Sequence, residues 1–252
     1  MGGVARLYGE SGAERLAASH VVVVGLGGVG SWAVEALVRS GVGRLTLIDG
    51  DCVEASNTNR QLPAIDPEYG RAKAEVLAER CRRIHPDCDV RAVVSFVTTE
   101  NVSTVIPLCD WVVDCIDDLT AKAVLSAEMK KIGRSLVVAG GAGGKVDPGF
   151  VTVDDLARAK GDALTSKLRT MLRKQYGFPK GRADGRSEPF GIPCVYSSEP
   201  LRQPEAANNE AIGAALGVRI GFGSSAAVTG TVGLRAASLV VNAIAFADGQ
   251  SR

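Results

Sequence analysis

A glycine-rich segment and a later aspartate are spaced for nucleotide binding. The segment is Gly25-Leu26-Gly27-Gly28-Val29-Gly30, and Asp49 follows 19 residues after Gly30. Glycines between a strand and a helix let backbone N–H groups approach a phosphate at the positive end of the helix. A carboxylate at the end of the next strand can accept hydrogen bonds from a ribose. The predicted nucleotide-binding residues here are Gly25, Gly27, Gly28, Gly30 and Asp49.

The polar residues that follow favour a triphosphate over a dinucleotide. Asn57, Arg60 and Lys73 lie beyond the acidic strand end. Hydride transfer needs no such cations, whereas attack at an α-phosphorus requires the charge on the leaving pyrophosphate to be neutralised. Asp117 ends a later apolar stretch and is the predicted Mg²⁺ ligand, because Mg²⁺ usually binds through one or two carboxylates plus phosphate oxygens. Asp51 is a further candidate for the ribose or the metal.

The elements that must position these residues alternate between strand and helix. Apolar runs typical of buried strands occupy residues 21–24, 45–48, 90–97, 111–117 and 135–139. Apolar residues at helical spacing predict helices over 31–39, 71–84, 101–106 and 120–131. This order implies an α/β fold with a Rossmann-like, doubly wound, mainly parallel sheet, whose ligands lie at the carboxyl ends of the strands.

The second half of the chain has a different pattern. Residues 150–153 alternate like an exposed strand, 154–176 look helical and polar, and 192–197 resemble a strand. We predict a buried or dimer-facing helix within 221–247, because Arg235 and several hydroxyl groups interrupt this apolar stretch; membrane contact is the alternative. One domain is expected, with an N-terminal arm (1–20), a nucleotide-binding core (21–148), a basic insertion and crossover (149–212) and a C-terminal apolar helix (213–252).

Charge and cysteine usage narrow the class of protein. The 252 residues carry a formal net charge of +1, so no overall attraction to nucleic acid or membrane is expected. Residues 160–186 nevertheless hold eight basic and two acidic side chains, either a solvated surface or a phosphodiester-binding patch. The six cysteines form no C-x-x-C pair, which argues against zinc and favours reduced thiols in a cytoplasmic protein. The candidate patch residues are Lys167, Arg169, Arg173 and Lys174.

The motifs together resemble the adenylation core of the ubiquitin-activating-enzyme-like ThiF/MoeB/HesA family. They are the glycine segment, Asp49, Ser56-Asn57 with Arg60-Gln61, Gly70-Arg71-Ala72-Lys73 and Asp114-Cys115-Ile116-Asp117. The resemblance implies that Asp49 binds the ATP ribose and that Asp117 binds Mg²⁺. It also implies phosphate contacts for Asn57, Arg60 and Lys73. Arg6 resembles the arginine that such enzymes lend to the partner subunit's ATP, which implies a homodimer.

Within the family, several segments resemble the branch that dehydrates threonylcarbamoyladenosine in tRNA. They are Arg6-Leu7-Tyr8-Gly9-Glu10, Thr58-Asn59-Arg60-Gln61, Gly140-Gly141-Ala142-Gly143-Gly144 and Cys194-Val195-Tyr196-Ser197-Ser198-Glu199. The implied reaction adenylates the threonyl carboxylate with ATP and then closes a ring with release of AMP. Because the internal nucleophile has a high effective concentration, no enzyme nucleophile is required.

Two other functions stay open at this point. An activator of a ubiquitin-like sulfur-carrier protein would share the adenylation step and use Cys194 as a nucleophile, although a buried strand thiol is the favoured interpretation of Cys194. A Rossmann-type NAD(P)-dependent oxidoreductase or a nucleotide-binding regulator would have no use for Arg60 and Lys73. A sulfur-transfer protein is a candidate partner, and a monovalent cation near the glycine cluster is a candidate cofactor.

Overall fold

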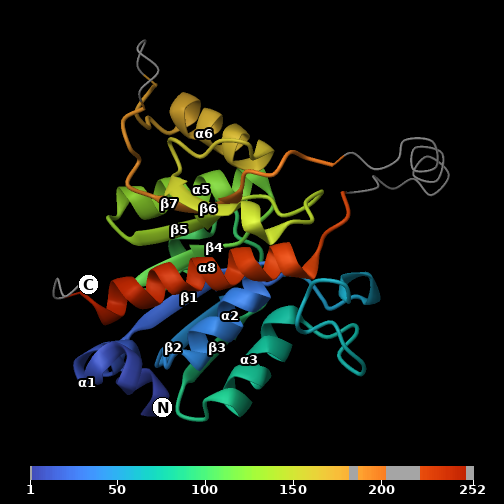
Figure 1. Ribbon diagram of the computed structural model, residues 1–252, viewed down its shortest axis with the longest axis vertical. Coiled ribbons are helices and arrows are strands. Elements are labelled where there is room, and N and C mark those ends of the chain that lie inside the picture. The colour runs from blue at the N-terminus through green and yellow to red at the C-terminus, as the bar shows by residue number, and fades with distance from the viewer. Residues whose placement is uncertain (1, 182–186, 203–221, 248–252) are drawn as a thin grey trace.

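A computed structural model describes residues 2–181, 187–202 and 222–247, and Figure 1 shows a twisted sheet with helices packed against it. The sheet has seven strands in the order β3-β2-β1-β4-β5-β7-β6. Only β6 runs antiparallel to its neighbour, so the predicted mainly parallel, doubly wound sheet is confirmed. The strands are β1 (His20–Val24), β2 (Arg44–Ile48), β3 (Asp89–Val93), β4 (Trp111–Asp114), β5 (Ser135–Ala139), β6 (Val151–Asp155) and β7 (Pro193–Ser197).

Helices cover both faces of this sheet, as the apolar strand runs predict. Side chains alternate across a strand, and in β1 Val21 and Val23 join one buried core cluster while Val22 and Val24 join the other. The first cluster packs under α1, α2, α3 and α8, and the second under α4, α5 and α6. The helices are α1 (Gly2–Ala18), α2 (Gly30–Arg39), α3 (Lys73–Ile84), α4 (Val102–Val105), α5 (Leu119–Lys131), α6 (Ala163–Gln175) and α8 (Ala226–Ala245), with short 3₁₀ turns at Ala55–Asn57 and Pro148–Phe150.

Helix α8 crosses the sheet beside α2 (Figure 1) and is a buried core helix, as predicted. Among the described residues it alone is long and apolar enough to cross a membrane, but 56% of its most apolar 18-residue segment is buried inside the protein. Its glycines permit a close crossing, because a Cβ on Gly233 would lie 2.3 Å from the carbonyl oxygen of Val29. The same crossing brings Gly230 against the ring of Trp32.

The N-terminal arm is helical, and α1 contains a kink at Gly9, where φ is +76°. Beyond the kink, the guanidinium of Arg15 donates hydrogen bonds to the carbonyl oxygens of Ile244 and Ala245. These bonds satisfy carbonyl groups at the C-terminus of α8 that the helix itself leaves without partners. The second half of α1 is therefore docked on α8, whereas Arg6 in the first half is exposed.

Some predicted boundaries are wrong. Residues 154–162 are not helical: β6 continues to Asp155, and α6 starts only at Ala163. The carboxylate of Asp155 accepts hydrogen bonds from the N–H groups of Phe190, Gly191 and Ile192, which fixes a strand end instead of a helix. The strands predicted over 90–97 and 111–117 end early, at residues 93 and 114. The parts of the predicted basic insertion and C-terminal helix at 182–186, 203–221 and 248–252 lie outside the described residues.

Candidate adenylation site

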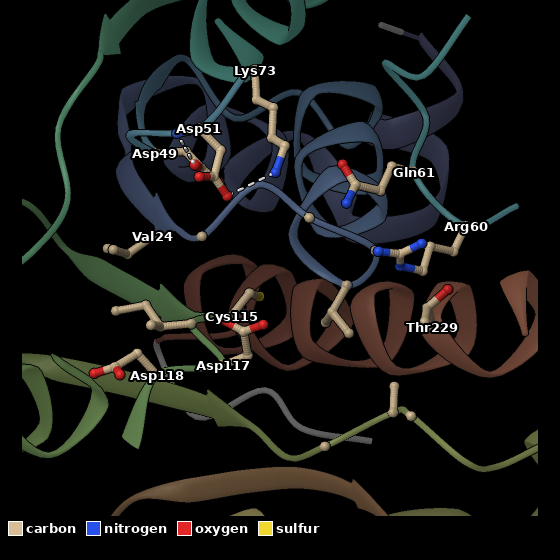
Figure 2. Close-up of a pocket in the computed structure, with 18 of the residues that line it drawn as sticks. Val24, Asp49, Asp51, Arg60, Gln61, Lys73, Cys115, Asp117, Asp118 and Thr229 are labelled. Atoms are coloured by element: carbon tan, nitrogen blue, oxygen red, sulfur yellow. Dashed lines mark hydrogen bonds and ion pairs between the residues drawn. The ribbon is translucent and has the colours of Figure 1, made fainter. Parts of the chain in front are cut away.

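A cavity of about 780 Å³ lies at the carboxyl ends of the central strands. The glycine segment after β1 forms one side of it, and the loop after β5 forms another. Figure 2 shows side chains from the loops after β2 and β4 pointing into the same space. This is the edge at which a doubly wound sheet binds ligands. The sequence-predicted residues that line the cavity are Gly25, Gly27, Gly28, Asp49, Asp51, Asn57, Arg60, Lys73 and Asp117.

Two glycines of the first loop are required by its shape. Gly25 has φ of +83°, a conformation that side-chain-bearing residues rarely adopt. Gly30 begins α2, and a Cβ on it would lie 1.8 Å from the carbonyl oxygen of Gly25. Gly30 therefore allows α2 to pack directly against the backbone of Gly25, whereas Gly27 and Gly28 face the cavity. Val29, the N-cap of α2, provides no side-chain cap; in the first turn of α2 the N–H of Ser31 donates to the carbonyl oxygen of Gly27 at 3.0 Å, within the glycine loop itself.

Asp49 ties this loop to the end of β2. One carboxylate oxygen accepts the N–H of Leu26 at 2.6 Å, and the other accepts the N–H of Asp51 at 2.8 Å. Burial raises the pKa of Asp49, and these two hydrogen bonds oppose the rise. Because a carboxylate offers about four acceptor sites, both oxygens retain capacity for ribose hydroxyl groups.

Lys73 enters the cavity from the first residue of α3. Its backbone N–H donates to the carbonyl oxygen of Asp51 at 3.0 Å, and its ammonium lies 3.0 Å from the Asp51 carboxylate. The dashed line between Lys73 and Asp51 in Figure 2 marks this ion pair. The Lys73 side chain is 7% exposed, whereas that of Asp51 is 56% exposed. Lys73 is thus a nearly buried cation whose counter-charge is solvated, an arrangement suited to receiving a phosphate.

In Figure 2, Gln61 lies between Lys73 and Arg60. The guanidinium of Arg60 donates to the carbonyl oxygen of Ser56 and to Oδ1 of Asn59. Trp32 of α2 donates its indole N–H to the Arg60 carbonyl oxygen at 3.1 Å, which holds this segment against the helix. Asn57 ends a 3₁₀ turn, and its Oδ1 accepts the N–H of Glu54 at 3.3 Å.

Gln61 is a cavity residue that the sequence reasoning left out of the site. It is 8% exposed, and its Oε1 is buried without a hydrogen-bond partner among the described residues. Its amide nitrogen faces Gly27. The sequence signal for Gln61 was its place in the motifs that carry the family resemblance, Ser56-Asn57 with Arg60-Gln61.

The loop after β4 places Asp117 in the cavity and Asp118 at the start of α5. Asp118 caps that helix by accepting the N–H of Ala121 at 2.8 Å. Asp114 points elsewhere: its carboxylate lies 2.8 Å from Lys122, and both side chains are fully buried. Burial raises the pKa of Asp114, and the Lys122 ammonium opposes the rise. Asp117 and Asp118 therefore both line the cavity, with Asp118 also used as a helix cap, whereas Asp114 is buried beneath the loop and accepts the N–H of Ile116.

Two predicted functional residues lie away from this cavity. Arg6 is exposed on α1 and does not line the cavity of its own chain. Cys194 is fully buried in β7, and burial strongly raises the pKa of its thiol. Because attack on a substrate requires an accessible thiolate, this burial favours the interpretation of Cys194 as a buried strand thiol over the nucleophile hypothesis.

The four residues of the predicted basic patch on α6 differ in exposure. Lys167 and Lys174 are exposed. Arg169 donates to the carbonyl oxygens of Leu156 and Ala159, and burial lowers the pKa of Arg169. Arg173 donates to the carbonyl oxygen of Pro179 and to the hydroxyl of Ser187, and it stacks on Phe190. Both arginines are half-buried and bonded within the domain, so the exposed Lys167 and Lys174 are the more accessible members of the predicted tRNA-contacting set.

Comparison with known proteins agrees with this geometry. The ThiF family model matches residues 3–248. The tRNA threonylcarbamoyladenosine dehydratases of Escherichia coli and Haemophilus influenzae are 43% and 40% identical, over 94% and 96% of this chain and 90% and 91% of their own lengths. The crystal structure of the E. coli dehydratase TcdA in complex with ATP superposes with a TM-score of 0.87 at 42% identity, covering 99% of this chain and 96% of that one. This chain therefore belongs to the ThiF family.

Proposed function

We propose that this protein is an ATP-dependent tRNA threonylcarbamoyladenosine dehydratase. The observation that carries the proposal is the convergence of Arg60, Lys73 and Asp117 on one cavity behind a glycine loop. The full-length likeness to the E. coli and H. influenzae dehydratases supports the choice of substrate. A tRNA substrate in turn implies a cytoplasmic location.

The proposed reaction has two steps. A threonyl carboxylate oxygen attacks the α-phosphorus of ATP, and the bond to pyrophosphate breaks. The ureido group of the same modification then attacks the acyl carbon, loses a proton and displaces AMP, so the substrate loses the elements of water. Lys73 and Arg60 would neutralise the charge that develops on pyrophosphate, while Asp49 would hold the ribose. The second step uses an internal nucleophile, which agrees with the burial of Cys194.

Asp117 is the residue proposed to hold Mg²⁺. Within the described ranges no three His, Cys, Asp or Glu side chains group into a metal site. One cavity carboxylate nevertheless fits Mg²⁺, because this ion usually binds through one or two carboxylates and completes its shell with phosphate oxygens and water. When bound, Mg²⁺ would add charge neutralisation at the phosphates. This chain would contribute the carboxylate of Asp117, which directly precedes Asp118, the N-cap of α5.

We further propose a homodimer in which Arg6 completes the partner's site. The part of α1 before the kink at Gly9 packs Val4 and Tyr8 against the core and leaves Arg6 and Leu7 exposed. Leu7 is 72% exposed, and an apolar side chain this exposed beside a cation fits contact with another chain. Arg6 has no place in the cavity of its own subunit, so supply by a partner accounts for both features.

The exposed lysines of α6 are the proposed tRNA contacts. Leu164, in the first turn of α6, lines the cavity, and Lys167 and Lys174 lie farther along the same helix. Their spacing of seven residues places them two turns apart on nearly one face. A phosphodiester backbone lying along this face would be directed toward the cavity. Lysines suit this role because phosphate contacts position a nucleic acid without reading its sequence.

The decisive experiment measures AMP formation by the purified full-length protein. Three substrates are supplied separately: tRNA carrying threonylcarbamoyladenosine, the same tRNA without the modification, and a ubiquitin-like sulfur-carrier protein. We expect AMP only with the modified tRNA, together with loss of 18 mass units, about one water, from the modified nucleoside. Pyrophosphate release with formation of a carrier acyl-adenylate, when only the carrier protein is supplied, would instead establish the sulfur-carrier activator.

A further inference from the structure

The loop after β5 lies beyond the residues assigned to ATP. We call Gly140–Gly144 the glycine wall; Gly140, Gly141, Ala142 and Gly143 line the cavity. The predicted nucleotide residues follow β2, β1 and β4, and β5 is the next strand in the sheet. Neighbouring strands are about 4.8 Å apart, so the glycine wall lies one strand beyond Asp117. The glycine wall therefore borders the cavity on the side away from β2 and Asp49.

One buried carboxylate holds the glycine wall in place. Asp162 Oδ2 accepts the N–H of Gly141 at 3.1 Å and a hydrogen bond from the ammonium of Lys145 at 3.2 Å. Its Oδ1 accepts the N–H of Thr165 at 2.7 Å, so the same side chain is the N-cap of α6. The wall and the helix that carries the exposed lysines therefore share one anchor.

Lys145 completes this anchor from the end of the wall. Its side chain is 3% exposed and that of Asp162 is 2% exposed. The ammonium also donates to the carbonyl oxygen of Ser197 at 2.5 Å, which ties the wall to the end of β7. Buried ion pairs are weak evidence for stability, because well-packed apolar residues of similar volume often stabilise equally well. A role in fixing geometry explains why a charged pair is present here.

The packing leaves the wall little freedom to shift toward its anchor. A Cβ on Gly140 would lie 2.8 Å from Cβ of Tyr196, and a Cβ on Gly141 would lie 3.2 Å from Asp162 Oδ2. Any side chain at these positions would move the wall relative to Asp162 and hence relative to the cavity. The absence of side chains also exposes the wall's backbone to whatever occupies the cavity.

We propose that Asp162 and Lys145 are positioning residues for the acyl substrate: they fix the glycine wall against which the threonylcarbamoyl group is held for attack on ATP. The inference rests on the proposed dehydratase function. Neither residue touches the nucleotide site, so the pair acts on the step that needs the second substrate and leaves ATP binding intact.

The test combines two variants with a control in the full-length protein. Asp162→Asn removes the charge but keeps one acceptor oxygen and the side-chain shape. Gly141→Ala keeps both charges. Alanine fits the backbone here because φ at Gly141 is not positive, and its Cβ, 3.2 Å from Asp162 Oδ2, would push the wall by a few tenths of an ångström. Asp154→Asn is the matched control, because Asp154 forms an exposed ion pair with Arg158 at 2.9 Å. Circular dichroism and thermal midpoints establish that each variant is folded.

The readouts are the dissociation constants of ATP and of modified tRNA, and the rate of AMP formation when both are saturating. Because displacement by about 1 Å can slow a reaction about 100-fold, we expect a loss of that order for Asp162→Asn and about tenfold for Gly141→Ala. Both dissociation constants should stay within about twofold of wild type, and Asp154→Asn should behave as wild type.

Three results would overturn the inference. The first is an unchanged rate in Asp162→Asn. The second is a rate loss that is matched by an equal loss of ATP affinity. The third applies if Asp162→Asn does not fold, and is a wild-type rate in Gly141→Ala. A wild-type protein that forms no AMP with modified tRNA would refute the proposed function itself, whereas active wild type with unaffected variants would refute only the role of this pair.

Discussion

Replacing Lys73 by methionine tests whether this residue stabilises the departing pyrophosphate. The ammonium is nearly buried in the cavity, and its counter-ion Asp51 is half exposed. Methionine removes the charge but keeps an unbranched side chain of similar length. The substitution therefore isolates the electrostatic contribution of Lys73 from its packing at the start of α3.

The structure sets the expected sizes of two separate effects. A unit charge about 4 Å from a phosphate oxygen contributes about 4 kcal/mol at an effective dielectric constant of about 20. Removing one such preorganised group from an active site typically lowers kcat by about 10²–10³-fold. Folding should change by less than about 1 kcal/mol, because an ion pair with a half-exposed partner is screened by solvent.

The assay measures kcat for AMP formation at saturating ATP and modified tRNA, together with the free energy of unfolding in urea. Lys131→Met is the matched control: Lys131 is 74% exposed and pairs with Glu128 at 3.2 Å on the surface of α5. We expect the control to retain the wild-type kcat and the Lys73 variant to lose about 10²–10³-fold.

Two outcomes would refute this reasoning. A kcat within about threefold of wild type would mean that Lys73 contributes no transition-state stabilisation, since the predicted loss is at least about 10²-fold. A parallel fall in unfolding free energy of several kcal/mol would instead make Lys73 a structural residue, and its ion pair with Asp51 would then be stronger than its exposure allows.

Three further predictions concern the dimer, the tRNA surface and the buried thiol. Inactive Arg6→Ala and Asp117→Ala proteins, mixed so that their subunits exchange, should regain about a quarter of wild-type AMP formation. Half of the dimers would then be mixed, and each mixed dimer would have one complete site out of two. No recovery would exclude supply of Arg6 by the partner. Changing Lys167 and Lys174 together to Ala should weaken tRNA binding and reduce the steepness of the plot of log binding constant against log salt concentration by about two. An unchanged slope would mean that these lysines do not contact tRNA phosphates. Cys194→Ala should retain AMP formation within about threefold in the same assay, since the reaction needs no enzyme nucleophile; a folded but inactive variant would contradict this.

The central sheet was readable from sequence because its strands are buried on both faces. Such strands appear as continuous β-branched runs, of which Val21–Val24 is an example, and parallel neighbours require a helix between them. The position of the site follows from the same logic, because residues that end successive parallel strands meet at one edge. That rule placed Asp49 and Asp117 at one cavity.

The remaining errors depend on contacts that are distant in sequence. Asp155 ends a strand because of N–H groups 35 to 37 residues away, which no local pattern reveals. The available basic surface depends on carbonyl groups that accept from Arg169 and Arg173 after folding. Gln61 stood in the quoted motifs beside Arg60 but was assigned no role, because nothing in the sequence shows that its amide is buried in the cavity.

The two loops that bracket the proposed reaction centre are anchored in the same way. Under the Asp117 loop, Asp114 accepts the N–H of Ile116 at 3.0 Å and pairs with buried Lys122. Under the glycine wall, Asp162 accepts the N–H of Gly141 and pairs with buried Lys145. In both cases the lysine also donates to a backbone carbonyl oxygen.

The glycine wall has few side chains that can pack, so a buried carboxylate that accepts a loop N–H is an alternative anchor, and the Asp117 loop adds such an anchor to the packing of Cys115 and Ile116. That carboxylate must itself be neutralised, because an isolated buried charge is strongly unfavourable. Each lysine therefore serves geometry more than stability. An apolar replacement of either pair that packs well would preserve folding yet remove the acceptor for the loop N–H, and so separate stability from turnover at both walls of the cavity.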